Sequence, residues 1–385
     1  IISSHLATPW QVLAITFTNK AAGELRERLV NAIGDEANDI WAYTFHSCCS
    51  RILRRFGEKI GYTNHFTIYD TDDSRRVMKQ CQKQLGIEDK LINHKSILAE
   101  ISRAKDSLIS PEEYKQTAQN DFRKSKIAEC YELYQAQLKK SDAMDFDDII
   151  FNTVKLLEEN EDVRNLYQTQ FKYVMVDEYQ DTNHAQYVLT SLLADKYKNI
   201  CVVGDDDQSI YRFRGATIEN ILSFENHYKG AKVIRLEENY RSTQNILDGA
   251  NAVISHNKNR KGKTLFTRSG SGDKIVYKTV MSESEESQYI IDEIVKNVNN
   301  GMKYSDHAIL YRMNAQSRNL EVMLTKSGIS HRIIGGHRFF DRKEIKDIVS
   351  YLAVINNPSD NVRLQRIINV PKLSLIHISE PTRRS

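Results

Sequence analysis

The stretch "FKYVMVDEYQDT" (171–182) decides the fold, because its apolar run ends in two adjacent acids, Asp177 and Glu178. A short apolar run bounded by polar residues predicts a buried strand. Two carboxylates at the end of such a strand lose hydration, which costs free energy unless a metal, a proton or another cation compensates. The stretch therefore predicts a strand that presents two carboxylates to a ligand.

Three more segments follow the same plan, an apolar run that ends in polar or glycine residues. They are "VLAITFTNK" (12–20), "ICVVGDDDQS" (200–209) and "KVIRLEENYRS" (232–242). Helical patterns separate them, as in "AAGELRERLVNAIG" (21–34), where apolar residues recur at four-residue spacing. Strands that alternate with helices predict an α/β fold with a parallel sheet, in which ligands gather at the carboxyl ends of the strands. The polar clusters are therefore expected to line one crevice.

A long insert, roughly residues 75–165, separates the first strand from the strand with the paired acids. Its helical periodicity, as in "IAECYELYQAQLKK" (127–140), predicts a helical subdomain. It closes with "MDFDDIIFNTVKLLEEN" (144–160), whose acids crowd at a helix start, where the macrodipole favours them. Beyond about residue 250 the α/β pattern restarts, with strands expected in 273–280, 307–317 and 331–336 and helices in 284–298 and 317–328.

The composition excludes several classes of protein. The chain has 385 residues, enough for two or three domains, and 54 Lys and Arg against 51 Asp and Glu leave a net charge of +3. Nucleic-acid binding would therefore have to come from local patches. The five cysteines, including adjacent Cys48 and Cys49, form no CxxC pair, which disfavours a cysteine metal site. With no secretory signal and no apolar run of membrane-spanning length, a cytoplasmic location is expected.

Both ends of the chain have unusual sequences. It opens with Ile1 rather than Met and enters the first predicted strand almost at once. Its last stretch, "LSLIHISEPTRRS" (373–385), breaks the preceding helical pattern and resembles translated sequencing adapter joined to a truncated reading frame. We therefore expect a fragment with a non-native tail.

The paired acids suit the hydrolysis of ATP. Asp177 can hold Mg²⁺, and Glu178 can share the metal or can orient and deprotonate the attacking water. In "VVGDDDQS" (202–209), Gln208 can sense a γ-phosphate. Acids at strand ends and helix caps are also common without a ligand, so the motif alone leaves both interpretations open.

Six short motifs and one long stretch then occur in a characteristic order. They are "ITFTNKAAGELRERL", "YTFHS", "VDEYQD", "VVGDDDQSIYRFRGA", "LEENYRST", "LYRMNAQSR" and "GGHRFFDRKEIKDIVSYLAVINNPSDNVRLQRIINVPK". The series resembles superfamily 1A DNA helicases of the PcrA/UvrD/Rep family over nearly all of residues 8–372. This resemblance implies two RecA-like P-loop NTPase domains, with ATP and Mg²⁺ between them and single-stranded DNA across their tops. It also implies ATP-dependent 3′→5′ movement on DNA, in DNA repair and replication.

The resemblance also implies a division into domains and a set of partners. Residues 1–74 and 166–248 would form the first RecA-like domain, interrupted by the helical insertion at 75–165. Residues 249–372 would begin the second RecA-like domain and its own insertion, before the tail at 373–385. Expected partners are single-stranded DNA, junctions of single- and double-stranded DNA, and repair or replication-initiator proteins.

At the nucleotide site the resemblance assigns roles residue by residue. Asp177 matches the Mg²⁺ ligand, Glu178 the catalytic base and Gln208 the γ-phosphate sensor. Tyr240 matches a residue that stacks on adenine, and Arg241 matches an arginine finger, whose fixed guanidinium suits the charge on the transferred phosphoryl group. Without its neighbouring motifs, Tyr240 would be interpreted instead as a half-buried core aromatic.

Aromatic and basic residues alternate in "SIYRFRGA" (209–216). Aromatic side chains stack on bases, worth about 1–3 kcal/mol per base, and arginines contact phosphates, so such contacts tolerate any base sequence. Many members of the family have tryptophan where this chain has Phe213, so weaker stacking is expected there. The positions that match DNA contacts in the family are Phe17, Asn19, His46, Tyr211, Phe213, Arg214, Arg312 and Asn314.

Two of these assignments have alternatives. Asn19 or Thr18 can cap the helix that follows the first strand, whose N-terminus would then face a DNA phosphate. His46 suits a structural hydrogen bond nearly as well as a DNA contact.

A basic stretch, "NRKGKT" (259–264), ends like a phosphate-binding loop. The eight-residue pattern needs a glycine where this chain has Asn257, and it needs a preceding strand, where this chain has a helical pattern. We therefore interpret the stretch as a basic surface turn near DNA. The true phosphate loop is expected just upstream of Ile1.

Two other functions stay open on the sequence. Without a phosphate loop, the chain as given would be a nucleic-acid-binding fragment that is inert toward ATP. The chain would also fit the helicase part of an AddA-like helicase–nuclease, with the nuclease domain further downstream.

Overall fold

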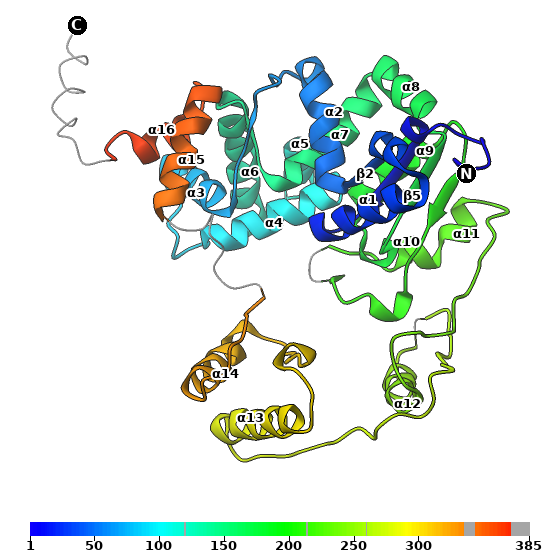
Figure 1. Ribbon diagram of the computed structural model, residues 1–385. Helices are drawn as coiled ribbons and strands as arrows, with labels where there is room; N and C mark the ends of the chain where they lie inside the picture. Colours follow the sequence, from blue (N-terminus) through cyan, green and yellow to red (C-terminus); the bar gives the residue numbers. More distant parts are fainter. Residues whose placement is uncertain (119–120, 213–214, 259, 335–342, 371–385) are drawn as a thin grey trace, which may run out of the picture. The chain divides into compact units, whose positions relative to one another are not determined.

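A computed structural model describes residues 1–118, 121–212, 215–258, 260–334 and 343–370 (Figure 1). The chain divides into two compact units, each with its own helices. The first unit comprises Ile1–Arg235, Asn257–Lys263 and the chain from Asp347 onward, and the second comprises Leu236–His256 and Thr264–Lys346.

The first unit is built on a four-stranded parallel sheet with the order β2-β1-β5-β6, which confirms the predicted α/β fold with a parallel sheet. Three of its strands occur where apolar runs predict them. The sequence does not predict β2, because its residues alternate between half-buried aromatic and buried small side chains instead of forming an apolar run. The strands are β1 (Val12–Thr16), β2 (Trp41–Thr44), β5 (Tyr173–Val176) and β6 (Ile200–Val202).

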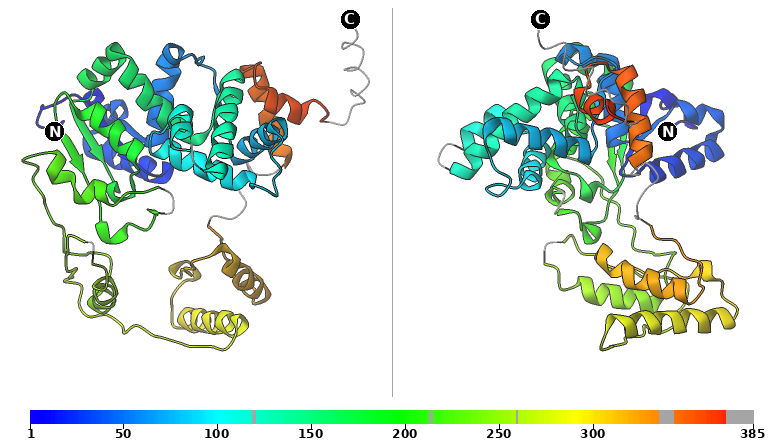
Figure 2. Two further views of the ribbon diagram at one scale, coloured as in Figure 1. Left: turned by 180° about the vertical axis from the view of Figure 1, so that it is seen from behind. Right: turned by 90° about the vertical axis from the view of Figure 1, so that its left-hand side faces the viewer.

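Helices cover both faces of this sheet (Figures 1 and 2). Because successive side chains of a strand point to opposite faces, Leu13 and Ile15 of β1 enter the larger core, and Val12 enters a smaller one. The smaller core includes Leu25 and Leu29, two of the periodic apolar residues of α1 (Asn19–Ile33), as predicted. The larger core is completed by α2 (Phe45–Phe56), α7 (Phe146–Glu159) and α9 (His184–Ala194).

The helices expected in the insert are present. Those between residues 71 and 140 enclose a core of their own, whereas those between 146 and 170 pack into the larger core. Asp145 caps α7 and forms a capping box with Asp148, so the crowded acids do mark a helix start. A short parallel pair joins β3 (Thr67–Ile68), which precedes the insert in the sequence, to β4 (Ala143–Met144), which lies within it. The other helices of the insert are α3 (Thr71–Leu85), α4 (His94–Asp106), α5 (Pro111–Thr117), α6 (Phe122–Lys140) and α8 (Glu161–Gln170).

The end of the described chain packs against α3. The Tyr69 hydroxyl donates a hydrogen bond to Asp360 Oδ1 at 2.7 Å, and Arg363 forms an ion pair with Asp73 at 3.3 Å. Val362 joins the core of the insert. The remaining helices of this unit are α10 (Glu219–Leu222), α11 (Phe224–His227), α15 (Lys343–Asn356, which enters the unit at Asp347) and α16 (Asn361–Ile367).

The second unit confirms the predicted helices but not the predicted strands. Its helices are α12 (Gln244–Ile254), α13 (Glu283–Asn299) and α14 (Asn314–Lys326). The described residues at 273–280, 307–313 and 331–334 form no strand, and the segment at 232–242 contributes only the isolated bridge between Glu238 and Phe266. Tyr277 and Leu310 are 90% and 94% exposed, so these stretches have the composition of strands without a neighbouring strand to pair with.

In the part of the chain that the structure describes, no helix combines the length and apolar character needed to cross a membrane. The structure leaves the predicted tail at 373–385 outside the described residues.

Candidate functional site

The carboxyl ends of the four parallel strands bring several of the predicted site residues to one edge of the sheet. In the register of the sheet, Thr16 of β1 pairs with Thr44 of β2, and Val176 of β5 pairs with Val202 of β6. Because the strands are parallel and in register, the turns that follow them leave the sheet on the same side. The segments that follow the strands, turns or the first residues of helices, contain Phe17, Asn19, His46, Asp177, Glu178 and Gln208.

Asp177 and Glu178 follow β5 directly, and both side chains are exposed. The backbone N–H of Asp177 donates to the carbonyl of Ile15 at 2.9 Å, which extends the β5–β1 ladder by one residue. Glu178 has φ of 50°, a left-handed conformation that costs a non-glycine residue about 1–3 kcal/mol and is concentrated at functional sites. The expected loss of hydration does not occur, because the strained turn directs both carboxylates out of the core.

A series of hydrogen bonds connects Glu178 with the turn after β6. Gln180 Nε2 donates to Glu178 Oε2 at 2.8 Å, and Gln180 Oε1 accepts from the backbone N–H of Asp205 at 2.9 Å. Asp205 Oδ2 accepts from Gln208 Nε2 at 2.7 Å. Neither Gln180 nor Asp205 was predicted from the sequence as a site residue, although they lie within "VDEYQD" and "VVGDDDQS". The predicted base and the predicted γ-phosphate sensor are thus three hydrogen bonds apart.

The turn after β1 starts α1. Of the two predicted caps, Thr18 is the N-cap, since its Oγ1 accepts a hydrogen bond from the N–H of Ala21 at 3.1 Å. Asn19 is the first helical residue and is exposed. Phe17 is half-buried and lies edge-on to Phe45, with ring centroids 5.5 Å apart. The core therefore fixes the orientation of Phe17, while Asn19 stays accessible at the helix N-terminus.

His46 packs against Phe146, the first residue of α7, with ring centroids 4.3 Å apart and the ring planes tilted by 39°. Burial lowers the pKa of His46 to about 4, although a hydrogen bond with the backbone of Phe146 acts in the opposite direction. The imidazole is therefore neutral at pH 7 and does not attract a phosphate by charge. These contacts favour the structural alternative for His46. Through its contact with His46, Phe146, whose side chain is 57% exposed, adds an aromatic surface at the same edge of the sheet. Phe146 was not among the residues predicted from the sequence.

The motif "VVGDDDQSIYRFRGA" (202–216) has near its end a glycine that packs against the helical insertion. Gly215 has φ of +81°, and a Cβ at this position would lie 2.6 Å from Asp106 Oδ2. Asp106 ends α4, and its Oδ1 accepts a hydrogen bond at 2.5 Å from Asn183, the N-cap of α9. Burial, and then the charge of Asp147, raise the pKa of Asp106 to about 7. Tyr211 of this motif is 39% exposed, whereas Phe213 and Arg214 lie outside the described residues.

Substituting alanine for Gly215 is expected to destabilise the first unit by about 2–3 kcal/mol, because it adds a steric overlap with Asp106 to an unfavourable φ. The measurement is urea unfolding followed by tryptophan fluorescence. Gly230→Ala is the matched control, since Gly230 has φ of +89° but a Cβ there would meet no other atom within 4 Å. Equal losses in the two variants would contradict a role for the Asp106 contact.

Four predicted site residues lie in the second unit. Tyr240 is 83% exposed, which excludes the half-buried core position, and a hydrogen bond to Glu238 raises the pKa of its phenol. Arg241 is exposed, and its backbone N–H donates to Asn239 Oδ1 at 2.9 Å. The other two are Arg312, which is exposed, and Asn314, which begins α14.

Comparison with known proteins identifies the family. The family model of the UvrD/REP helicase N-terminal domain matches residues 1–229, and that of the UvrD-like helicase C-terminal domain matches residues 234–377. The chain belongs to the UvrD/REP helicase family. Within it, the chain is similar to proteins named ATP-dependent DNA helicase PcrA, with 52% identity to that of Staphylococcus epidermidis and 50% to that of Staphylococcus aureus, each over 365 residues.

These two matches cover 95% of the chain and 50% of each relative. The chain thus spans about half the length of the curated relatives it matches. Membership of the UvrD/REP helicase family accounts for the order of the motifs and for the mixed α/β fold with parallel sheets.

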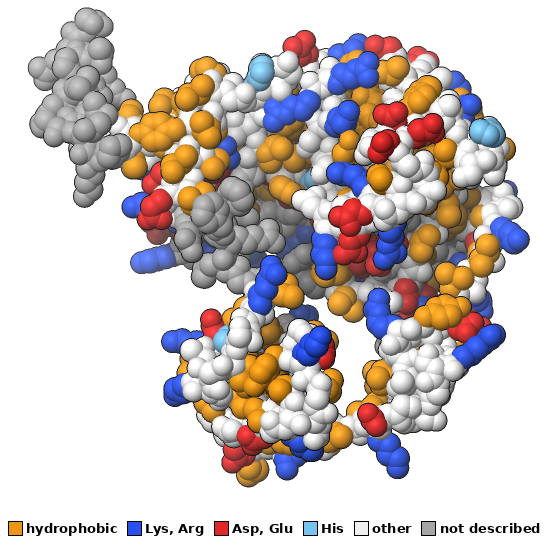
Figure 3. Space-filling model, viewed as in Figure 1, with side chains coloured by type: hydrophobic (Ala, Val, Ile, Leu, Met, Phe, Trp, Pro, Cys, Tyr) orange, Lys and Arg blue, Asp and Glu red, His pale blue; other side chains and the backbone are white. Residues whose placement is uncertain are grey.

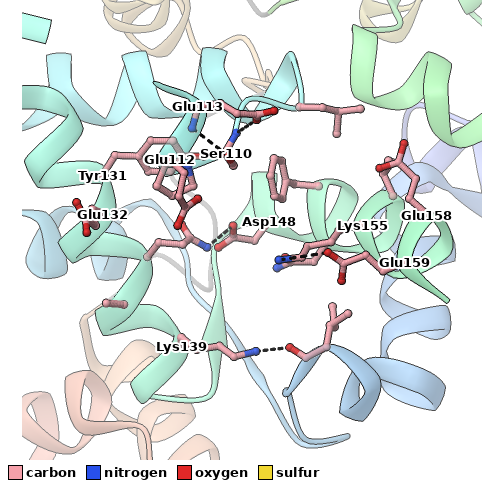
Figure 4. A pocket seen from close by; sticks show the side chains of 18 of the residues that line it. Ser110, Glu112, Glu113, Tyr131, Glu132, Lys139, Asp148, Lys155, Glu158 and Glu159 are labelled. Atoms are coloured by element: carbon pink, nitrogen blue, oxygen red, sulfur yellow. Dashed lines mark hydrogen bonds and ion pairs between the residues drawn. The ribbon is translucent and has the colours of Figure 1, made fainter. Parts of the chain in front are cut away.

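A cavity of about 740 Å³ lies in the helical insertion, away from the strand ends where the UvrD/REP helicase motifs gather. Figure 4 shows Glu112 and Glu132 on one side of it and Glu158 and Glu159 on the other. Six acidic residues line the cavity against two lysines, Lys139 and Lys155, and this excess of negative charge disfavours a triphosphate or a DNA backbone.

Charged side chains of both signs are interspersed over the surface drawn in Figure 3, and Lys and Arg form no continuous stripe on this face of the described residues. This distribution agrees with the net charge of +3.

Proposed function

We propose that the whole protein is an ATP-dependent 3′→5′ DNA helicase and translocase that couples ATP hydrolysis to movement along single-stranded DNA in DNA repair and replication. The observation that carries the proposal is the convergence of Asp177, Glu178 and Gln208 at the carboxyl edge of one parallel sheet. Family membership and the printed names of the relatives support it.

In the proposed reaction, Glu178 accepts a proton from the water that attacks the γ-phosphate. Gln180 orients this carboxylate by donating to Oε2, which leaves Oε1 for the water. Gln208 senses the γ-phosphate, and Asp205 fixes the direction of its amide. Tyr240, whose ring is largely exposed, stacks on adenine, and Arg241 stabilises the transferred phosphoryl group.

The carboxylates of Asp177 and Glu178 fit a divalent cation, because they are exposed oxygen donors on adjacent residues. When bound with ATP, Mg²⁺ neutralises phosphate charge. In our proposal Asp177 is its main protein ligand, with Glu178 close enough along the chain to share it.

On the nucleic-acid side, we propose that Phe17, Asn19 and Tyr211 contact single-stranded DNA from the first unit, together with Phe213 and Arg214. His46 acts there mainly by holding Phe146. Arg312 and Asn314 contribute from the second unit. Stacking and phosphate contacts of this kind carry no base preference, as translocation requires. Junctions of single- and double-stranded DNA, and repair or replication-initiator proteins, are the proposed partners.

The test is DNA-stimulated ATP hydrolysis and strand separation by a full-length version of the protein. We expect ATP turnover to rise with single-stranded DNA, and a duplex with a 3′ single-stranded tail to be unwound in preference to one with a 5′ tail. Turnover that ignores DNA would contradict the motor, and preference for the 5′ tail would contradict only the direction.

A second proposal concerns the chain as given. The only GKT sequence in residues 1–385 is Gly262-Lys263-Thr264, which lacks the first glycine of a phosphate loop and follows the helix α12. We therefore expect this chain to bind single-stranded DNA without binding ATP. Titration with a fluorescent ATP analogue, with and without single-stranded DNA, checks this. Micromolar binding of the analogue would show that the phosphate loop is dispensable.

A further inference from the structure

The basic turn at 260–263 is held by the three consecutive acids that follow β6. Arg260 forms a two-point contact with Asp207, with Nε 2.7 Å from Oδ1 and a terminal nitrogen 2.5 Å from Oδ2. The backbone N–H of Lys261 donates to Asp206 Oδ2 at 2.7 Å. The Lys263 ammonium forms an ion pair with Asp205 Oδ1. Each acid of the turn thus has a partner in one short basic segment of the same unit.

These ion pairs are more shielded from water than most others in the described chain. The four side chains of Arg260, Asp207, Lys263 and Asp205 are only 12–21% exposed. Pairs such as Lys115 with Glu132, by contrast, are about 60% exposed on both sides. Shielding strengthens a charge-assisted hydrogen bond, and the planar guanidinium adds a fixed orientation. The basic turn is therefore a well-defined support for the acidic turn.

Asp205 connects this support to the proposed catalytic groups. One of its oxygens binds Lys263, and the other accepts from Gln208. Burial acts to raise the pKa of Asp205, yet hydrogen bonds from Lys263 and Gln208 hold it below its usual range. The backbone N–H of Asp205 donates to Gln180, which in turn donates to Glu178. A continuous series of contacts therefore connects Lys263 with both Gln208 and Glu178.

We propose that Arg260 and Lys263 are positioning residues that hold the γ-phosphate-sensing turn 205–208, an inference that rests on the proposed function. Lys263 fixes the Asp205 carboxylate that orients Gln208. Arg260 fixes the other end of the same turn through Asp207. The cations of this turn are thus engaged by carboxylates instead of being free for DNA, which changes the role expected from the sequence.

The first test measures the turn directly, by hydrogen exchange in the chain as given. The backbone N–H of Asp207 donates to Asp205 Oδ1, the oxygen that also binds Lys263, and the N–H of Gln208 donates to the Asp205 carbonyl. In Lys263→Met and in Arg260→Gln, we expect amide exchange in peptides covering 203–210 to be roughly tenfold faster. Lys258→Met is the matched control, because Lys258 is exposed and forms no ion pair with a described residue. Unchanged exchange in both variants would overturn the inference.

The second test measures ATP turnover in a full-length version. We expect Lys263→Met and Arg260→Gln to lower kcat roughly tenfold, with KM for ATP and the Kd for single-stranded DNA nearly unchanged. The exchanged pair Arg260→Asp with Asp207→Arg should recover most of the loss in kcat.

Weaker DNA binding with a smaller salt dependence, at unchanged kcat, would instead show a DNA contact and overturn the inference. Absence of turnover in the unmodified protein would refute the proposed function, while the exchange test still decides the positioning role.

Discussion

Glu178→Gln in a full-length version of the protein is expected to lower DNA-stimulated ATP turnover by about 10²–10⁴-fold, the range that a positioned general base contributes. The glutamine keeps the side-chain length and an oxygen that can still accept the hydrogen bond from Gln180. It loses the basic carboxylate that accepts the proton. Because Glu178 is exposed at the strand end, the core is untouched, and binding of nucleotide and DNA should survive. The measurement is steady-state ATP hydrolysis at saturating single-stranded DNA, with the Kd for ATP measured in parallel.

Two further variants make this result specific. Glu158→Gln makes the same chemical change on the rim of the acidic cavity and should leave turnover unchanged. Asp177→Asn should raise the Mg²⁺ concentration needed for half-maximal turnover, because it removes the charge of the proposed ligand. Wild-type turnover in Glu178→Gln would refute its assignment as the base. Loss of both turnover and nucleotide binding would show that the side chain acts on the structure of the site.

Contacts close in the sequence were predictable for the site. The run at 173–176 predicted β5, since an apolar segment of this length buries itself in a sheet, and it placed the two acids at the end of the strand. Their exposure was not predicted, because it depends on the left-handed turn at Glu178. The N-cap at Thr18 follows from the preference of hydroxyl side chains for helix starts. Each of these depends on neighbours a few residues apart.

Contacts between distant parts of the sequence were not predictable. Nothing local in "NRKGKT" indicates that Arg260 meets Asp207, 53 residues earlier. Likewise, Gly215 packs on Asp106 because α4 and the loop after β6 meet in three dimensions. The sequence motif predicted a role for Gln208. It did not predict that Lys263, which is distant in the sequence, would hold the Asp205 carboxylate that orients Gln208.

The predicted strands of the second unit failed for a related reason. Apolar runs such as 275–277 have strand composition, but composition specifies only a preference, and a strand forms by hydrogen bonding to another strand. Tyr277 is 90% exposed, so no partner among the described residues covers it. Helices α13 and α14 form hydrogen bonds within themselves and were therefore predictable.

Lys105→Met is expected to destabilise the first unit by about 3–5 kcal/mol at pH 8, the second-largest effect we predict. Lys105 is 1% exposed, and its ammonium lies 2.7 Å from Asp145 Oδ2 and 2.8 Å from Asp148 Oδ1. Both acids belong to the capping box that starts α7. Methionine fills the space of the lysine stem but leaves two buried carboxylates without their cation. Urea unfolding followed by tryptophan fluorescence measures the loss.

Lys115→Met is the matched control, because Lys115 also pairs with a carboxylate, Glu132 at 2.9 Å, but both of these side chains are about 60% exposed. It should leave the unfolding midpoint unchanged. Adding Asp148→Asn to Lys105→Met should recover part of the loss, since it removes one of the two unpaired charges. If Lys105→Met alone were as stable as the unmodified protein, the two carboxylates would not need the lysine for stability.

The pH dependence distinguishes lost charge pairing from lost packing. Burial acts to raise the pKa of Asp145, but the charge and hydrogen bond of Lys105 hold it below its usual value, so Asp145 stabilises the native protein above about pH 4. Burial and then the charge of Asp145 already raise the pKa of Asp148 to about 7, against the opposing effect of Lys105. Without Lys105, the pKa values of Asp145 and Asp148 in the folded protein both rise. The folded variant then binds protons at these two acids more tightly than the unfolded chain does. The loss of unfolding free energy in Lys105→Met should therefore become smaller as the pH falls from 8 to 5. A loss caused by packing alone would stay constant over this pH range.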